Sequence, residues 1–181
     1  SIREDVERLA EELDRKSREI ATRAKRELDE ILRKDKEISD RARKELEEIL
    51  KKLKEIADRD KDERKIRRVL EEAEDLVRRV VELNKKSLEE ARKLVEDVLR
   101  LLEESLKESK DLVERAKERI TGKEVEKRLD DALKRNAEEV EDVKRKLKDV
   151  LREVERTVRE SEKDLRRVLE EVERAVREIR R

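Results

Sequence analysis

The sequence contains no cysteine, histidine, proline, methionine or aromatic residue, and it has a single glycine. Without histidine or cysteine, the chain offers no Ser-His pair, no thiolate nucleophile and no ordinary zinc site. Without a glycine-rich loop it has no phosphate-binding turn. Without aromatic side chains it lacks the platform on which single-stranded nucleic acids stack. We therefore predict that the protein is not an enzyme and that it binds no cofactor, metal or small-molecule ligand.

Acidic and basic residues are equally numerous, 54 of each, and together they make up 60% of the chain. This balance argues against a dedicated binder of nucleic acid or of a membrane surface, because such binders carry an excess of positive charge. No run of about 18 apolar residues occurs, so no segment is predicted to span a membrane. A calcium site made only of carboxylates stays open. The acidic residues are interleaved with Lys and Arg, which favours a solvated, salt-bridged face instead.

The sequence opens at Ser1, without an initiator methionine and without an apolar N-terminal segment. We therefore expect no targeting signal, and we expect the cytoplasm of an expression host as the location. The absence of cysteine leaves the redox compartment open.

The apolar residues, 33% of the chain, are periodic, which distinguishes the sequence from a disordered one of similar charge. Residues 20–37 and 38–55 carry one 18-residue pattern twice, with eleven of the 18 positions identical. Eighteen residues make about five turns of α-helix, so each repeat returns the same face to the same direction. A repeat of this length predicts a straight helix, whereas a seven-residue repeat would predict a supercoil.

The apolar stripe changes phase by roughly 140° after residue 57, counted at about 100° per residue. The segment 58–62 contains no glycine or proline, but its aspartates at positions 58, 60 and 62 are residues that favour helix caps. We therefore predict a tight turn there. A continuous helix through the segment is the alternative.

A second phase change, of about half a turn, follows Gly122. We expect this glycine to be the left-handed residue just past a helix end. The two breaks predict helices at about 1–58, 63–120 and 123–181.

Three helices of equal length with short turns predict an all-α fold, a single-chain antiparallel up-down-up bundle of nearly untwisted helices. We predict that residues 1–181 form one domain. Ser1 and Glu4 fit a capping box at its start. Idealised helices around an aliphatic core also predict a hyperstable protein, with helical circular dichroism persisting above about 90 °C.

The chain resembles computationally designed helical bundles with straight, parametrically generated helices. The resemblance rests on the 18-residue repeats, the capping Ser1, the single Gly122 in a loop, and a core of only Leu, Ile, Val and Ala. It covers the whole chain but is one of style, and it carries over no catalytic residue. It implies a stable scaffold or building block made to test or present a geometry. The first turn departs from the glycine- or proline-marked loops usual in such designs. Natural spectrin-like or apolipoprotein-like bundles are the rival, although they normally contain aromatics, proline or histidine.

Polar residues interrupt the apolar stripes at ten positions, which are the candidate site. They could line a ligand or proton pathway, but Ser, Thr and Asn have no useful acidity at neutral pH. We favour buried hydrogen bonds that fix helix partners and register. The ten residues are Ser17, Asp35, Ser39, Asn84, Ser87, Ser105, Ser109, Asn136, Thr157 and Ser161.

The positions of the turns predict which of these residues face one another. If the first turn is centred near residue 61, a residue of the first helix faces the residue of the second helix for which the two numbers add to about 122. If the second turn is centred near residue 122, facing residues of the second and third helices have numbers that add to about 244. The polar residues then fall into two layers. The expected pairs are Ser17 with Ser105, Ser109 with Asn136, Asp35 with Ser87, Ser39 with Asn84, Ser87 with Thr157, and Asn84 with Ser161.

Two hypotheses about function follow. The first is a structural scaffold, a monomeric rigid rod with no natural biochemical function. The alternative is an interaction protein that self-associates, or that binds a partner helix, through the wide apolar face in the middle of the second helix. That face carries Val81, Leu83, Leu99 and Leu101. A monomer is expected, and a homo-oligomer stays open.

Overall fold

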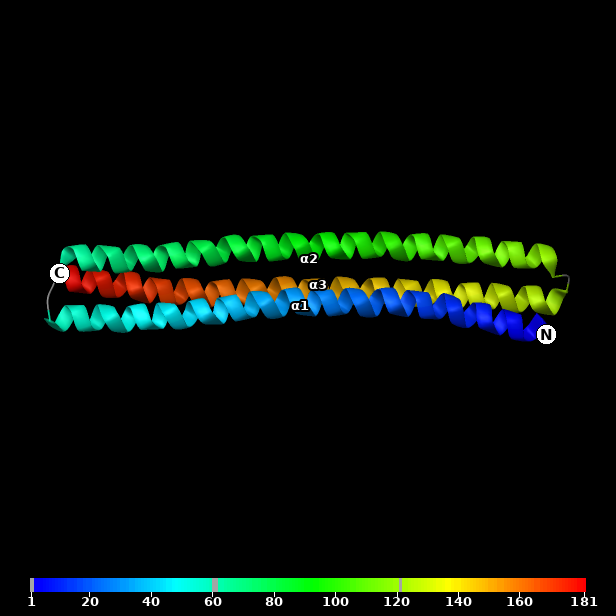
Figure 1. Ribbon diagram of the computed structural model, residues 1–181, viewed down its shortest axis with the longest axis horizontal. Helices are drawn as coiled ribbons and strands as arrows, with labels where there is room; N and C mark the ends of the chain where they lie inside the picture. Colours follow the sequence, from blue (N-terminus) through cyan, green and yellow to red (C-terminus); the bar gives the residue numbers. More distant parts are fainter. Residues whose placement is uncertain (1, 60–61, 121) are drawn as a thin grey trace. The chain divides into compact units, whose positions relative to one another are not determined.

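The computed structural model describes residues 2–59, 62–120 and 122–181, with side chains from residue 4 onward. It contains three helices: α1 at Ile2–Arg59, α2 at Glu63–Arg119 and α3 at Lys123–Arg180 (Figure 1). The described residues contain no strand. The predicted all-α three-helix bundle is therefore confirmed, and each helix end lies within one residue of its predicted position. The cap expected at Ser1 falls outside the described residues.

The break between α1 and α2 rules out a continuous helix through this segment. Asp62 caps the start of α2: its Oδ1 accepts a hydrogen bond from the backbone N of Arg64 at 3.0 Å. The carbonyl oxygen of Asp62 also accepts the first helical bond, from the N of Ile66 at 3.1 Å. A side-chain oxygen at this position satisfies a backbone N–H that the helix itself leaves unpaired. Of the three aspartates in the predicted turn, Asp62 is the one that caps the helix, while Asp60 lies outside the described residues.

Replacing Asp62 with alanine is expected to lower the free energy of unfolding by about 1 kcal/mol, because the Arg64 N–H loses its acceptor. Guanidinium unfolding followed by circular dichroism measures the change. Asp62→Asn is the matched control and should retain most of the stability, since asparagine caps a helix about as well. Equal losses in the two variants would contradict the capping role.

The second turn differs from the expectation at Gly122. Its φ is 158°, which is positive but far from the value of about 57° that defines the left-handed helical region. Its carbonyl oxygen accepts a hydrogen bond from the N of Glu126 at 3.1 Å, which is the first helical bond of α3. Gly122 is therefore the N-terminal cap residue of α3 and not the left-handed residue that ends α2. Glycine is among the residues favoured at that position as well, so composition alone did not separate the two roles.

The chain divides into two compact units that share the three helices. Unit 1 comprises Ser1–Asp29 and Ala91–Arg152, and unit 2 comprises Glu30–Glu90 and Glu153–Arg181. Each unit thus contains one segment from each helix. Within a unit, the segments of α1 and α3 run parallel and the segment of α2 runs antiparallel to both.

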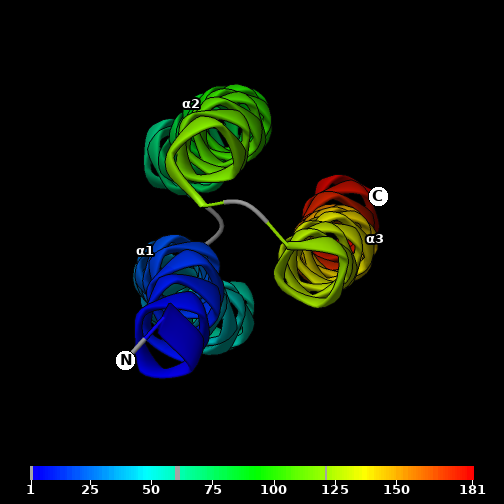
Figure 2. The same ribbon diagram turned by 90° about the vertical axis from the view of Figure 1, so that its right-hand side faces the viewer.

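Unit 1 packs its three segments around a shared aliphatic core. Figure 2 looks onto its end, where α1, α2 and α3 follow one another clockwise around a common centre. One cluster joins all three segments: Val6 and Leu13 of α1, Val113 of α2 and Leu129 of α3 are each at most 5% exposed.

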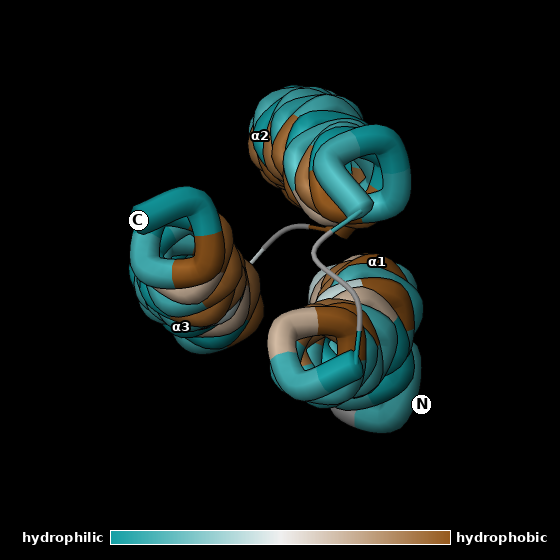
Figure 3. Tube along the Cα trace, turned by 90° about the vertical axis from the view of Figure 1, so that its left-hand side faces the viewer, coloured by the Kyte–Doolittle hydropathy of each residue, from teal (hydrophilic) through white to brown (hydrophobic). Residues whose placement is uncertain are grey.

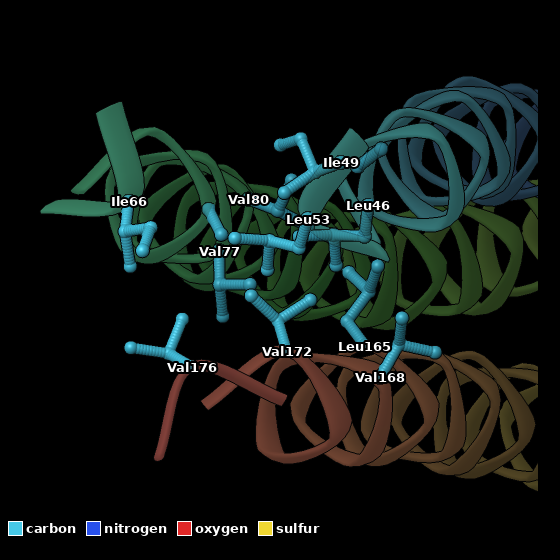
Figure 4. Close-up of a cluster of buried hydrophobic side chains, with 12 residues drawn as sticks. Leu46, Ile49, Leu53, Ile66, Val77, Val80, Leu165, Val168, Val172 and Val176 are labelled. Atoms are coloured by element: carbon cyan, nitrogen blue, oxygen red, sulfur yellow. The ribbon is translucent and has the colours of Figure 1, made fainter. Parts of the chain in front are cut away.

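Unit 2 has a core of the same aliphatic kind. In Figure 3 the apolar stretches of the nearest turns lie on the sides of the helices that face one another. Leu53 of α1, Val77 of α2 and Val172 of α3 point toward a common centre (Figure 4). Leu46, Leu53 and Val172 have no exposed surface, so this cluster is closed to solvent. Burying aliphatic side chains of this size contributes about 1.5 to 3 kcal/mol each.

Candidate functional site

Four of the ten predicted polar residues lie in unit 1. Ser17, Ser109 and Asn136 are at most 3% exposed, and Ser105 is 9% exposed. The Nδ2 of Asn136 donates to the Oγ of Ser17 at 3.4 Å, and that hydroxyl donates to the carbonyl of Leu13, also at 3.4 Å. The first bond connects α3 to α1, and the second lies within α1. The hydroxyl of Ser109 donates to the carbonyl of Ser105 at 2.8 Å, a bond within α2.

The unit 1 residues therefore gather at one level but do not all pair as expected. Asn136 bonds to Ser17, whereas the predicted register paired Asn136 with Ser109. Ser17 does not bond to Ser105. The Oδ1 of Asn136 has no hydrogen-bond partner among the described residues. A buried polar atom left without a partner costs about 1 to 3 kcal/mol, so this cluster is not optimised for stability alone.

The other six polar residues lie in unit 2, where hydrogen bonds join Asn84 and Ser87 to the carboxylate of Asp35. Asp35, Ser39 and Asn84 are at most 4% exposed. The amide of Asn84 faces the carboxylate, and with its nitrogen on that side it donates to Oδ1 at 3.0 Å and to Oδ2 at 2.8 Å. Ser87 donates a further hydrogen bond to the same carboxylate. Two side chains of α2 thus hold one charged group of α1.

The remaining members of this group are peripheral. The Oγ of Ser39, which the register had paired with Asn84, has no hydrogen-bond partner in the described part of the chain. Thr157 and Ser161 on α3 are half-buried, and no hydrogen bond among the described residues links them to Asp35 or Asn84. The contact between Asp35 and Ser87 is the one that the register predicts directly.

The surroundings of Asp35 change the pKa of its carboxyl. Burial raises the pKa of its carboxyl above the ordinary value of 3.8, because a charge is poorly solvated there. The hydrogen bond from Ser87 lowers the pKa, since it favours the ionised form, and the nearby negative charge of Glu162 raises it. The net direction is upward.

A second polar group, which sequence reasoning missed, lies next to Ser17 in unit 1. The guanidinium of Arg18 binds Glu139 at 2.9 Å, joining α1 to α3. Burial raises the pKa of Glu139, and so does a hydrogen bond with the carboxyl of Asp14, while Arg18 lowers it. Asp14 precedes Ser17 by three residues, and Glu139 follows Asn136 by three, so each shares a helix face with a predicted site residue. That spacing was the signal available in the sequence.

A lysine on α3 is also well covered. The side chain of Lys144 is 15% exposed, and its Nζ lies 3.2 Å from Glu103 of α2 and 3.3 Å from Glu141. Burial lowers the pKa of Lys144, but the hydrogen bonds and charges of the two glutamates outweigh it and raise the pKa overall. Lys144 is therefore a charged side chain whose ion pair with Glu103 connects α3 to α2, and it does not provide a neutral amine for catalysis.

These groups offer little reactive chemistry. In the described residues, no set of three or more acidic side chains is placed to hold a metal ion. The amide of Asn84 and the hydroxyl of Ser87 both donate to the carboxylate of Asp35, so these polar side chains bind one another. Within the described ranges, no helix is both long and apolar enough to cross a bilayer.

No protein-family model matches the sequence, and no curated protein matches it either. Among solved structures, the fold is similar to a computationally designed three-helix bundle. The likeness covers 98% of this chain and 82% of the other, with 17% sequence identity and a TM-score of 0.46.

Proposed function

We propose that the protein is a designed structural scaffold, a rigid helical building block without a natural biochemical activity. One observation carries the proposal: the aliphatic 18-residue pattern repeats in all three helices, and the chain contains no histidine, cysteine or tyrosine. Histidine is the most frequent general acid or base in enzymes, and histidine and cysteine are the usual ligands of zinc. Here the buried polar residues are almost all Ser and Asn.

The role that we propose for the ten polar residues is to select the alignment of the helices. Sliding one helix by 18 residues returns aliphatic residues to equivalent places, so the aliphatic core alone specifies register weakly. A slide would, however, separate Asn84 from Asp35 and Asn136 from Ser17, leaving buried polar atoms without partners. That penalty supports a function in specificity, as polar residues in helical bundles can provide.

Solution measurements on the intact protein test the scaffold proposal. The helical circular dichroism signal should persist above about 90 °C. A helix of 58 residues is about 87 Å long, so X-ray scattering should give a longest dimension of about 85 to 90 Å if the helices are straight. Light scattering should give a mass near 21.8 kDa. Cooperative melting near 55 °C would count against an idealised scaffold, and a longest dimension of about 170 Å would count against the folded-back helices.

A further inference from the structure

A groove of about 430 Å³ lies between the segments of α1 and α2 in unit 1. Its floor is aliphatic: Ile20 and Ala24 come from α1, and Leu94, Val98 and Leu101 come from α2. The three residues of α2 are spaced by four and three positions, so they form one stripe along the helix. The small side chain of Ala24 leaves room opposite this stripe.

Leu101 is the feature of this groove that the core of unit 1 does not explain. Half of its surface, 50%, is exposed, although its neighbour Leu102 is completely buried. The other large hydrophobic residues exposed to a similar degree in the described chain, Leu83 and Leu112, do not line this groove. Leu101 and the aliphatic floor together form one apolar surface enclosed by charged residues, and contiguous apolar surfaces with a polar rim occur at docking sites.

The rim of the groove is mainly acidic. Five acidic side chains line it against two basic ones, although acidic and basic residues are equally numerous in the whole chain. One of the two basic residues, Lys16, is already paired with Glu108 across the groove at 3.7 Å. The acidic residues are Glu19, Glu27, Asp97, Glu104 and Glu108, and the basic ones are Lys16 and Arg23.

We propose that this groove binds one basic amphipathic α-helix of another polypeptide, which completes a local four-helix arrangement. From Leu94 to Glu108 the groove follows 15 residues of α2, or about 22 Å, which matches four turns of a docked helix. The partner would place apolar residues at i, i+3 or i+4, i+7 and i+11 on the floor. Lysine or arginine beside this stripe would face the acidic rim.

A second copy of this chain fits the groove less well than such a helix. Two copies joined by the same groove would bring acidic rim against acidic rim in either orientation, and like charges at close range oppose association. A basic helix meets the opposite charge along both edges. The proposal goes beyond the scaffold role and does not depend on it, because a designed or a natural bundle could present the same surface.

Fluorescence anisotropy with a labelled synthetic peptide tests the proposal. The probe is a capped 15-residue peptide of leucine and lysine, with leucine at i, i+4, i+7 and i+11. Two comparison peptides are used: one in which glutamate replaces every lysine, and one with the same composition in scrambled order. We expect saturable binding of the basic amphipathic peptide alone, and a loss of affinity as salt is raised, because salt screens the rim charges.

Two variants with a matched control locate the binding site. Leu101→Lys and Glu104→Lys should each weaken binding at least tenfold, while Leu112→Lys should leave the affinity unchanged. Leu112 is 41% exposed and does not line the groove, so its replacement removes a comparable exposed leucine elsewhere on α2. Circular dichroism checks that all three variants fold, which their exposed positions favour.

Three outcomes would overturn the proposal. The first is that the acidic or the scrambled peptide binds as tightly as the basic one. The second is that Leu112→Lys weakens binding as much as Leu101→Lys. The third is that sedimentation shows a dimer which Leu101→Lys dissociates, because a second copy would then occupy the groove. None of these outcomes bears on the thermal stability and mass that test the scaffold role.

Discussion

Replacing Asn84 with alanine is expected to destabilise the protein by about 3 kcal/mol at neutral pH, because it leaves a buried charge without its main donor. Asn84 lies 3.0 and 2.8 Å from the two oxygens of the Asp35 carboxylate, and Asp35 is only 3% exposed. In the variant, the hydrogen bond from Ser87 remains as the compensation for the charge. Guanidinium unfolding at pH 7 measures the loss.

The loss should shrink as the pH is lowered. Burial raises the pKa of Asp35 in the folded protein above its ordinary value of 3.8, so the folded state binds this proton more tightly than the unfolded state. The protonated carboxyl of Asp35 therefore stabilises the folded protein. This contribution is fully present below pH 3.8, and it is lost as the pH rises through the raised pKa of Asp35 in the folded state. In the Asn84→Ala variant the carboxylate of Asp35 loses the hydrogen bonds from the amide, which raises the pKa of Asp35 further. A loss that grew on acidification would contradict this account.

A double variant provides the matched comparison. Replacing both Asp35 and Asn84 with leucine removes the charge together with its donor, and it is expected to stabilise the protein by about 1 to 4 kcal/mol. If the polar cluster selects register, the same variant should show more than one alignment or oligomeric state. Sedimentation would detect mixed oligomers. If the double variant were a uniform monomer with unchanged helix alignment, the polar cluster would not select the register and would only lower the stability of the protein.

Replacing Leu46 with alanine is expected to destabilise the protein by about 2 to 5 kcal/mol, because a completely buried side chain would leave a cavity. Leu46 has no exposed surface and belongs to the aliphatic cluster of unit 2 described above. Guanidinium unfolding again measures the change. Leu83→Ala in the same unit is the control, since Leu83 is 41% exposed and its loss should cost well under 1 kcal/mol. Similar losses in the two variants would show that Leu46 is not part of a closed core.

The helices could be predicted from the sequence because one strong signal, the 18-residue period, recurs in all of them. The break after residue 57 has no glycine or proline, yet the phase of the stripe located it, and Asp62 then fitted as the cap. Gly122 was located correctly but given the wrong helix. A glycine between two helices satisfies the preferences of both ends, and only its φ and its bond to Glu126 distinguish them.

The polar clusters were predicted less completely. Residue-number sums apply to the antiparallel neighbours, α1 with α2 and α2 with α3, and they brought Asp35 to Ser87. They do not cover the parallel helices α1 and α3, which the bond between Asn136 and Ser17 connects. They also place residues only to within about one turn, so Asn84 bonds to Asp35, one turn before Ser39 on α1. The single domain, the straightness of the helices and the function of the polar residues in register stay predictions.

The division into two units has a consequence for how cooperativity is distributed along the chain. Their boundaries fall inside helices, near residues 29, 90 and 152, and not at the turns. Cooperative opening follows packed cores, not covalent order. Backbone amides of Val6 and Leu129, which share a core but lie far apart in sequence, should therefore lose hydrogen-exchange protection together. Amides of Leu28 and Leu46, five turns apart on one continuous helix, are expected to exchange by separate events, so we predict that the unit of unfolding is a packed core and not a helix.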